Sequence, residues 1–423
     1  MVRSVCNRAA TAARSAVLLL ALALLVLPLS STFARGAAEP EPERLTVITQ
    51  WGGEDLEDLQ WFLDIYTEET GIEMEAISAG EREFRVTMPL SFEAGEPPAD
   101  VIFHPWMELH QGYAAAGHMM PLDELLELDQ FSESFLDLIS VEGTVYGVPL
   151  RVGLKPGFFY KRSFFARHGL EEPQTYPEFL ELLDTLKEID GLEAPIASGN
   201  GDGWPLTDVT EGFILGLGGT DLFNAIIDGD ANFTDPELAE IMEEVARLVA
   251  EGYFSPARDW QSQVEELWDE NYGLFWSHGV PRLAGFQHDH EEIGFFPFPG
   301  TSGITAAFNF MSVPVYTRNE EAARDFVRWV QSAEAQTRLA ERRGELVGRL
   351  DVPNEAYPEH LRQQQVLLED YTLLPDLDDI IGGEFLEAFR DQLKLLWSAP
   401  DRLADVLEDI SDAAPASTGR QVR

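Results

Sequence analysis

Aromatic and polar side chains occur together just after two predicted strands near the start of the chain. The strands are Leu45–Thr49 and Val101–Phe103, and the side chains that follow them are Trp51, Glu54, His104, Trp106 and Glu108. An indole ring packs well against a flat apolar surface, and charged side chains make strong hydrogen bonds. The pattern favours a site for a small molecule with apolar faces and a polar rim. The alternatives are a core position for Trp51 and a structural role for His104.

A second group of such side chains lies in a glycine-rich loop, Ser198–Asp208, with the sequence Ser-Gly-Asn-Gly-Asp-Gly-Trp-Pro-Leu-Thr-Asp. The loop precedes a predicted helix, and its candidate contact residues are Trp204, Asp208 and Glu211. The alternative is an ordinary boundary between loop and helix, with Asp208 near the helix start.

The elements that must position these side chains alternate between strands and helices. The first half of this pattern contains strands at 45–49, 72–77 and 101–103, and helices at about 56–69 and 83–94. A second stretch follows Leu150, with strands at 158–160, 293–298 and 311–315 and helices at about 178–189, 235–250 and 320–331. Alternation of this kind predicts an α/β fold with a largely parallel sheet. In the helix at 320–331 the predicted buried stripe is Ala323, Phe326, Val327 and Val330.

Motifs for enzymes and cofactors are missing from the sequence. It contains no Gly-x-Ser-x-Gly elbow, no His-Glu-x-x-His and no P-loop, and Gly216–Gly219 lacks the dinucleotide-binding spacing. The run His288–Glu292 (His-Asp-His-Glu-Glu) offers ligands for a divalent cation, or is a solvated loop. We expect no cofactor, no bound metal and no catalytic residues.

The first 34 residues have the pattern of a Sec-type signal peptide. Three arginines precede the apolar run Ala16–Leu27, and Ala34 offers a small-residue cleavage site. The alternative is a retained anchor helix. The only cysteine, Cys6, lies before the apolar run, so the sequence offers no lipobox cysteine. We expect a periplasmic or extracellular protein.

The charge balance is strongly acidic. The chain of 423 residues has 29 basic and 75 acidic residues, a net charge of −46, and only four lysines. Such a field repels nucleic acid and anionic lipid, so neither is an expected partner. The acidic residues are spread along the chain, which suggests a surface suited to high salt.

Ten segments of the sequence, in order, resemble one protein family. They are Trp51 after the first strand, Thr70-Gly71-Ile72, Ala99–Phe103, Tyr113–Leu122, Gly143–Pro149, Phe159–Gly169, Trp204–Leu206, Tyr272–Gly279, Ile293–Pro299 and Asn319–Val330. Together they resemble the extracellular solute-binding proteins of carbohydrate ABC transporters, the group that includes maltose-binding protein.

The resemblance implies the type II periplasmic-binding-protein fold, with two hinged α/β lobes that are each discontinuous in sequence. One lobe would comprise residues 44–150 and about 281–318, the other 151–280 and about 319–412, with a flexible tail at 413–423. The ligand, a neutral carbohydrate, would bind in the cleft between the lobes. The implied partners are that ligand and the membrane subunits of an ABC permease, and the protein itself is expected to be a monomer.

The resemblance also indicates further contact residues. Arg151 lies where the family has its hinge and a polar contact residue, although it could simply pair with a carboxylate. Trp276 and His278 occupy the segment in which family members usually carry Gly-x-Trp. The usual stacking ring is missing there, and Phe308 and Asn309 are candidates to replace it as ring and amide.

Two other classes of function remain open at this point. The first is a binding protein for a different solute, namely a polyamine, glycerol-phosphate or a divalent metal. The second is a secreted glycoside hydrolase, which would also combine aromatic rings with two carboxylates. With 75 acidic residues, a pair of carboxylates alone does not identify such an enzyme.

Overall fold

The computed structural model describes residues 44–80, 82–198, 201, 203–276, 289–343, 345–365 and 367–414. These residues belong to one compact unit, Pro42–Arg423. The predicted signal peptide, His278, and residues 281–288 at the expected lobe boundary lie outside the described residues. No helix in the described ranges has both the length and the apolar character that a membrane span requires.

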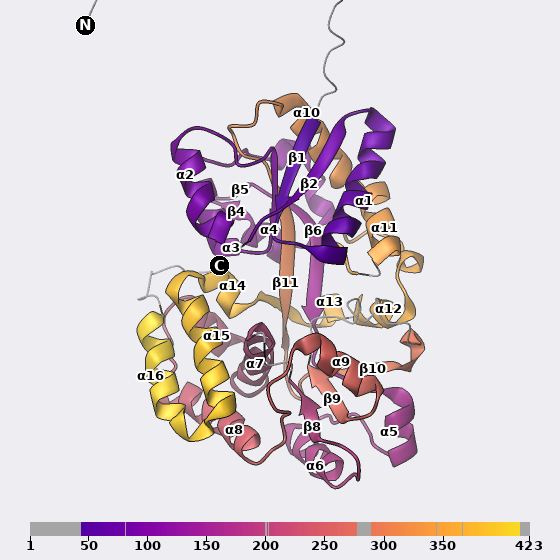
Figure 1. Cartoon of the computed structure of the whole chain (residues 1–423), viewed down its shortest axis with the longest axis vertical. Helices are drawn as coiled ribbons and strands as arrows, with labels where there is room; N and C mark the ends of the chain where they lie inside the picture. Colours follow the sequence, from indigo (N-terminus) through magenta and orange to yellow (C-terminus); the bar gives the residue numbers. More distant parts are fainter. Residues whose placement is uncertain are drawn as a thin grey trace, which may run out of the picture. The chain divides into compact units, whose positions relative to one another are not determined.

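The larger of the two main sheets has six strands (Figure 1). They are β1 (Arg44–Thr49), β2 (Glu73–Ser78), β3 (Val101–His104), β6 (Val148–Lys155), β11 (Gly303–Ser312) and β12 (Thr372–Pro375). The strand order is β12-β11-β3-β1-β2, and β6 pairs with β11. β1 is parallel to β2 and β3, whereas β11 is antiparallel to β3 and β6.

The smaller sheet has four strands in the order β10-β7-β9-β8. They are β7 (Phe158–Lys161), β8 (Ala194–Ala197), β9 (Tyr272–Trp276) and β10 (Ile293–Phe296). Only β8 and β9 pair in parallel, so this sheet is more antiparallel than the sequence pattern predicted. A separate short hairpin consists of β4 (Ser140–Val141) and β5 (Thr144–Val145).

Helices surround both sheets. In the first part of the chain they are α1 (Gly53–Thr70), η1 (Glu83–Thr87), α2 (Met88–Glu93), α3 (Met107–Ala115), η2 (Asp123–Leu125), η3 (Leu128–Gln130) and α4 (Glu133–Leu138). The middle part contains α5 (Arg162–His168), α6 (Tyr176–Lys187), α7 (Trp204–Ile227), α8 (Pro236–Ala250), α9 (Trp260–Trp268) and η5 (His290–Glu292). The last part contains α10 (Glu320–Val330), α11 (Ala333–Arg343), η6 (Asn354–Ala356), α12 (Glu359–Gln365), α13 (Leu367–Asp370), α14 (Leu377–Ile381), α15 (Gly383–Ser398), η7 (Pro400–Arg402) and α16 (Leu403–Ala413).

Local sequence explains several helix ends. α1 stops at Gly71, because this residue takes a left-handed conformation (φ 80°) and its N–H donates to the carbonyl of Thr67. α6 begins with a reciprocal capping box between Thr175 and Glu178. α7 contains a break at Gly219, whose φ of 78° lies outside the helical range.

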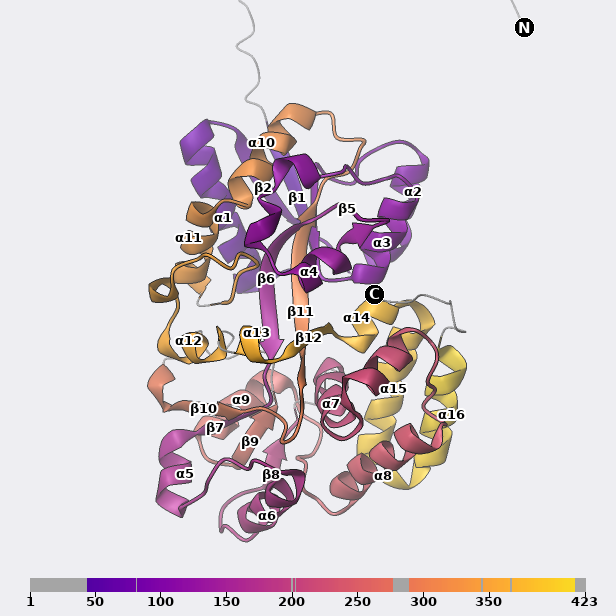
Figure 2. The same cartoon turned by 180° about the vertical axis from the view of Figure 1, so that it is seen from behind.

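Two large hydrophobic clusters define two lobes. The first lobe is built around the six-stranded sheet and includes Phe62, Phe103 and Phe310, whereas the second includes Phe158 and Phe213. The long strands β6 and β11 run between the lobes (Figures 1 and 2). The fold is therefore the expected two-lobed α/β arrangement, with these two strands as connections.

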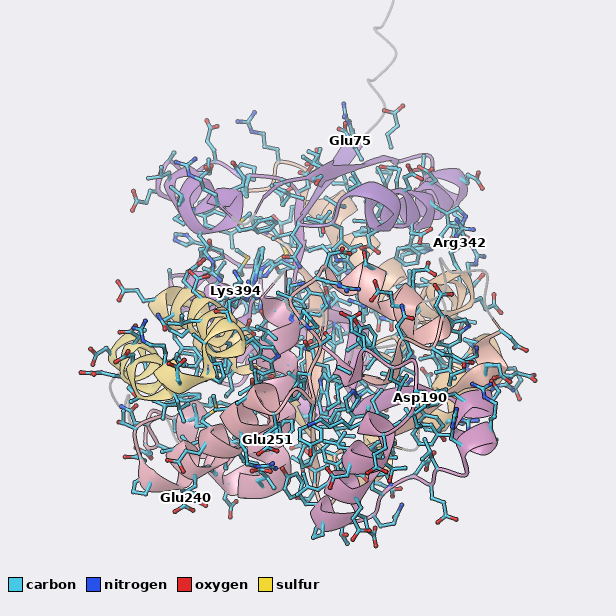
Figure 3. All side chains as sticks on the ribbon, turned by 60° about the horizontal axis from the view of Figure 1, so that its bottom comes forward. Glu75, Asp190, Glu240, Glu251, Arg342 and Lys394 are labelled. Atoms are coloured by element: carbon cyan, nitrogen blue, oxygen red, sulfur yellow. The ribbon has the colours of Figure 1, made fainter. Side chains whose placement is uncertain are left out.

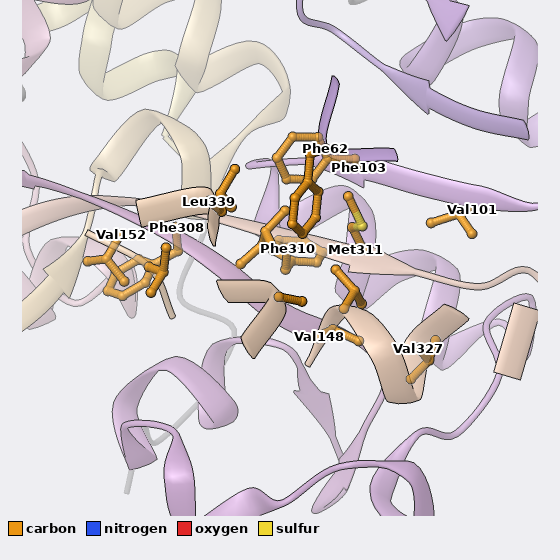
Figure 4. Packing of buried hydrophobic residues seen from close by; sticks show 14 of the residues in the cluster. Phe62, Val101, Phe103, Val148, Val152, Phe308, Phe310, Met311, Val327 and Leu339 are labelled. Carbon is orange, nitrogen blue, oxygen red and sulfur yellow. The ribbon is translucent and has the colours of Figure 1, made fainter. Parts of the chain in front are cut away.

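The helices α10 and α11 require a correction to the expected lobe boundaries. The predicted apolar stripe of α10 is buried, but it packs in the first lobe, whereas residues from about 319 to 412 were expected in the second lobe. Figure 4 shows Val327 of α10 and Leu339 of α11 in the same cluster as Val148 and Phe310. An amphipathic pattern identifies the buried face of a helix but not the sheet that covers it.

A second difference concerns β10, which pairs with β7 in the smaller sheet although residues 281–318 were expected in the first lobe.

The acidic side chains cover both lobes (Figure 3). Glu75 in β2, Asp190 after α6 and Glu240 in α8 are examples from separate elements.

Candidate functional site

A cavity of about 410 Å³ lies between the two lobes. From the first lobe and the connecting strands it is lined by Gln50, Trp51, Gly52, Asp55, Pro105, Trp106, Arg151, Ala307 and Asn309. From the second lobe and the end of β6 it is lined by Lys155, Trp204, Asp208, Asp378, Asp379 and Arg390. A more open groove of about 520 Å³ is formed by the second lobe alone, along β7, α5 and the loop as far as Gln174.

The first-lobe side of the cavity is formed by the carboxyl ends of parallel strands. Gln50 and Trp51 follow β1, and Pro105 and Trp106 follow β3. Because β1 and β3 are parallel, both chain segments leave the sheet at the same edge. This edge is the usual ligand site of open α/β sheets.

Trp51 and Trp106 are fixed by contacts with the core behind them. Trp51 packs edge-to-face on Phe103, with ring centroids 4.7 Å apart. Trp106 packs in the same way on Phe84 at 5.0 Å, and the backbone N–H of Trp106 donates to Nδ1 of His104 at 3.1 Å. The two rings therefore have little freedom before a ligand arrives, which lowers the entropy cost of binding.

The third aromatic ring, Trp204, is placed by the start of α7. The preceding residue, Gly203, has a φ of 89°, and a Cβ atom there would lie 2.5 Å from Cε of Lys394. Only glycine fits this position, so the sequence Gly203-Trp204-Pro205 fixes where the helix begins and where the indole enters the cavity lining.

Lys155 is the centre of a buried cluster of carboxylates at the second-lobe side. Its Nζ lies 2.6 Å from Oδ1 of Asp208 and 2.6 Å from Oδ2 of Asp376. Burial lowers the pKa of Lys155, but the negative charges of Asp208, Asp376, Glu211 and Asp378 outweigh it and hold this pKa well above its usual value. Lys155 is therefore a permanent cation that joins β6 to α7 and to the start of α14.

The carboxylates of this cluster outnumber the charge of Lys155. Burial and the charge of Asp376 raise the pKa of Glu211 well above its usual value, and burial raises the pKa of Asp376 to about 6. Oε1 of Glu211 accepts the N–H of Leu377 at 3.0 Å. The cluster thus favours the protonated form of Glu211.

Oxygens of Asp208, Glu211 and Asp376 lie within 4.8 Å of one another, a spacing that could suit a metal ion. The ammonium group of Lys155 already lies 2.6 Å from two of these three carboxylates. The described geometry is therefore that of a buried ion-paired lysine rather than of a metal centre.

The other two cations of the lining are also paired with carboxylates. Nε of Arg151 lies 2.7 Å from Oε2 of Glu345, and both side chains are buried. Nη2 of Arg390 lies 2.8 Å from Oδ2 of Asp378. Arg151 also lies over the ring of Trp51, with Cζ 5.9 Å from the ring centroid. These pairs fix both arginines in the cavity wall.

Six of the residues predicted from the sequence lie in the cavity lining. They are Trp51, Trp106, Arg151, Trp204, Asp208 and Asn309. The side chain of Glu54, in the first turn of α1, and the whole of His278 lie outside the described residues.

Five predicted contact residues do not line this cavity. Phe308 lies in the core of the first lobe against Phe135, with ring centroids 4.7 Å apart, so our expectation of a stacking ring there was wrong. Figure 4 shows Phe308 beside Val152 within this core. Because neighbours in a strand point to opposite faces, Asn309 reaches the cavity and Phe308 cannot.

The remaining four residues support the site or the core. Trp276 packs in the second core, edge-to-face on Phe158 at 4.9 Å. His104 is buried behind Trp106, and burial together with the charges of His110 and Arg85 lowers its pKa well below the usual value. Glu211 belongs to the cluster around Lys155.

Glu108 is the fourth of these residues. It pairs with Arg85, whose Nη1 lies 3.2 Å from Oε2 of Glu108.

Sequence reasoning missed nine lining residues, namely Gln50, Gly52, Asp55, Pro105, Ala307, Lys155, Asp378, Asp379 and Arg390. One signal was available for Lys155, because it is one of only four lysines and follows the predicted hinge. The acidic run that contains Asp378 and Asp379 carried no such signal, because acidic residues are spread along the whole chain.

Comparison with known proteins identifies the family. The family model described as "Bacterial extracellular solute-binding protein" matches residues 49–337. The chain is 34% identical over 373 residues to an uncharacterized ABC transporter extracellular-binding protein of Pyrococcus horikoshii, covering 88% of each chain. It is 26% identical to the alpha-glucosides-binding periplasmic protein AglE of Rhizobium meliloti, covering 81% of this chain and 80% of AglE.

Solved structures show the same fold. A chitin oligosaccharide binding protein matches with a TM-score of 0.75 and 20% identity, covering 88% of this chain and 99% of the other. The solute-binding protein RafE in complex with raffinose matches with a TM-score of 0.71 and 17% identity, covering 88% and 100%. The architecture is thus the two-lobed, type II periplasmic-binding-protein fold. From the family match and the relative above 30% identity, we conclude that the chain belongs to the bacterial extracellular solute-binding proteins.

Proposed function

We propose that this protein is the substrate-binding component of an ABC importer. It captures a sugar or oligosaccharide in the cavity between the lobes and delivers it to a membrane permease. Family membership and the ABC-transporter relative support the class of function. Relatives such as the alpha-glucosides-binding protein support a carbohydrate as the ligand.

The composition of the cavity wall is the main support for a sugar as the ligand. Three indole rings, Trp51, Trp106 and Trp204, come from both lobes and share one cavity with the amide of Asn309 and several charged groups. A sugar ring has apolar C–H faces, which pack on aromatic rings, and a rim of hydroxyls, which need hydrogen-bond partners. The cavity offers both within about 410 Å³.

We propose that the protein binds the sugar without breaking or forming a covalent bond in it. Two lining carboxylates, Asp208 and Asp378, are engaged with Lys155 and Arg390, which is a positioning role. We further propose that the protein is exported by its predicted signal peptide, acts as a monomer, and takes an uncharged ligand.

A melting-temperature screen of the full chain tests this function. The panel contains neutral mono- and oligosaccharides, with spermidine, glycerol-3-phosphate and Zn²⁺ for the other solute classes. A ligand at about 100 times its Kd stabilises the native state by about 2.7 kcal/mol. We expect a shift with at least one neutral sugar, and recovery of that sugar unchanged by chromatography. A shift with Zn²⁺ alone, or progressive cleavage of the sugar, would contradict the proposal.

A pair of tryptophan variants locates the binding site. Loss of a stacking aromatic ring costs about 1–3 kcal/mol with planar ligands, which corresponds to about 5- to 150-fold in affinity. Trp204→Ala is expected to weaken sugar binding by this factor. The guanidinium of Arg342 lies over the ring of Trp61 in α1, and Trp61 does not line the cavity. Trp61→Ala is therefore the matched control and should bind the sugar normally.

A further inference from the structure

The start of α14 holds three aspartates in the sequence Asp376-Leu377-Asp378-Asp379, and two of them are tied to other elements. Asp376 is 2.6 Å from Lys155, and Asp378 accepts from Nε and Nη2 of Arg390 at 2.9 and 2.8 Å. The N–H of Leu377 donates to Glu211. The backbone of this short helix is therefore anchored on both β6 and α7.

Asp379 differs from its two neighbours. It lines the cavity and is half-buried, and within the described parts of the chain its carboxylate makes no hydrogen bond or ion pair. Its neighbours hold the backbone, so Asp379 is not needed to fix the helix. A carboxylate that is held in place but unused by the protein is suited to contact a ligand.

The cations of the lining cannot serve an anionic ligand in the same way. Arg151 is committed to Glu345 at 2.7 Å, Lys155 to Asp208 and Asp376, and Arg390 to Asp378. Because a carboxylate already balances each of these positive charges, an incoming carboxylate or phosphate would gain little net attraction from them. It would also meet the charge of the acidic residues at the start of α14.

The same charges act on Asp379 itself. Burial, followed by the charges of Asp378 and Asp376, raises the pKa of Asp379 well above its usual value. The same negative field that favours the protonated form of Asp379 also opposes the entry of an anionic ligand. A hydroxyl can exchange hydrogen bonds with either form, whereas a protonated amine would favour the ionised form.

We propose that Asp379 contacts the ligand and selects its charge, accepting hydroxyl or ammonium groups and rejecting carboxylates and phosphates. This inference rests on the proposed function, and it assigns the choice between neutral and charged sugars to one residue. Among derivatives of one sugar, the neutral sugar and the amino sugar should bind, and the sugar acid should be rejected.

The test uses titration calorimetry of the full chain with matched probes. These are glucose, glucosamine and glucuronate, together with cellobiose, the glucosamine dimer and cellobiouronate. For the wild type we expect the acidic sugar of each set to bind at least about tenfold more weakly than the neutral sugar. This factor corresponds to the free energy of about one hydrogen bond to a charged group. In Asp379→Asn the affinity for the neutral sugar should fall by about tenfold. The ratio of the affinities for the neutral and the acidic sugar should fall below about threefold.

The control is Asp391→Asn, which removes the same charge from the exposed face of α15, where Asp391 pairs with Lys394 at 3.1 Å. It should keep the wild-type ratio. Asp379→Glu retains the charge and should keep the rejection of acids. Because Asp379→Asn removes repulsion from Asp378 and Asp376, its melting temperature should equal or exceed that of the wild type.

Two failures are distinguishable. If no sugar binds the wild type, the proposed function is wrong and this inference falls with it. If neutral sugars bind, but Asp379→Asn preserves the ratio between neutral and acidic sugar, the inference is overturned and the proposed function stands.

Discussion

Replacing Lys155 by methionine tests the cluster that joins the hinge strand β6 to the second lobe. Lys155, Asp208 and Asp376 are 5%, 2% and 2% exposed, and each carboxylate lies 2.6 Å from the ammonium nitrogen. Removing one partner of a buried ion pair typically costs about 3–5 kcal/mol, because the other charge remains buried without compensation. We expect Lys155→Met to lose about this much free energy of unfolding.

The matched control is Lys394→Met. Lys394 pairs with Asp391 at 3.1 Å, but the two side chains are 42% and 68% exposed. Exposed pairs contribute about 0–1 kcal/mol. Both variants are compared with the wild type by urea denaturation followed by circular dichroism. Equal stability of Lys155→Met and Lys394→Met would refute the electrostatic role of the cluster.

The pH dependence of the same experiment has a definite sign. Burial raises the pKa of Asp376 to about 6 in the folded protein, so the native state binds this proton more tightly than the unfolded chain. The contribution to stability is present below about pH 4 and is lost as the pH rises through about 6. Without Lys155 the carboxylates are harder still to ionise, so the deficit of Lys155→Met should be larger at pH 8 than at pH 5. A deficit that is independent of pH would contradict this reasoning.

Two further predictions concern the first lobe and the contact between lobes. Burial lowers the pKa of His110 to about 4, so it contributes stability above about pH 6.5 that is lost as the pH falls through about 4. His110→Phe should flatten this part of the acid unfolding curve measured by circular dichroism, and His168→Gln, at an exposed site, should not. Gly382 has a φ of 65°, and a Cβ there would collide with the carboxylate of Glu108 from α3. Gly382→Ala should therefore weaken sugar binding, measured by calorimetry, more than Gly300→Ala, where φ is 88° but the Cβ meets nothing within 4 Å. Equal affinity of these two glycine variants would exclude a role for the contact between Glu108 and Gly382 in sugar binding.

Much of the first-lobe side of the site was predictable because it depends on local sequence. A β-branched run that ends at a tryptophan places Trp51 and Trp106 at the carboxyl edge of the sheet, and the structure puts both in the cavity lining. Successive side chains of a strand point to opposite faces of the sheet. This explains why the prediction was right for Asn309 and wrong for Phe308. The hydrophobic pattern alone does not say which of two neighbours faces the core.

The second-lobe side was harder to predict, because its residues meet only in the folded chain. Lys155 and Asp376 are separated by 221 positions yet form an ion pair at 2.6 Å. In a chain with 75 acidic residues, no single aspartate such as Asp379 stands out in the sequence. Long-range pairing, rather than local propensity, decides which of these carboxylates reach the cavity.

Binding of a sugar between the lobes can be measured by hydrogen exchange of the full chain with and without a saturating neutral oligosaccharide. We expect the ligand to protect backbone segments from both lobes together, around 50–55 and 105–106 in the first and 204–208 and 376–390 in the second. Protection confined to one lobe, for example to the groove between Tyr160 and Gln174, would contradict it.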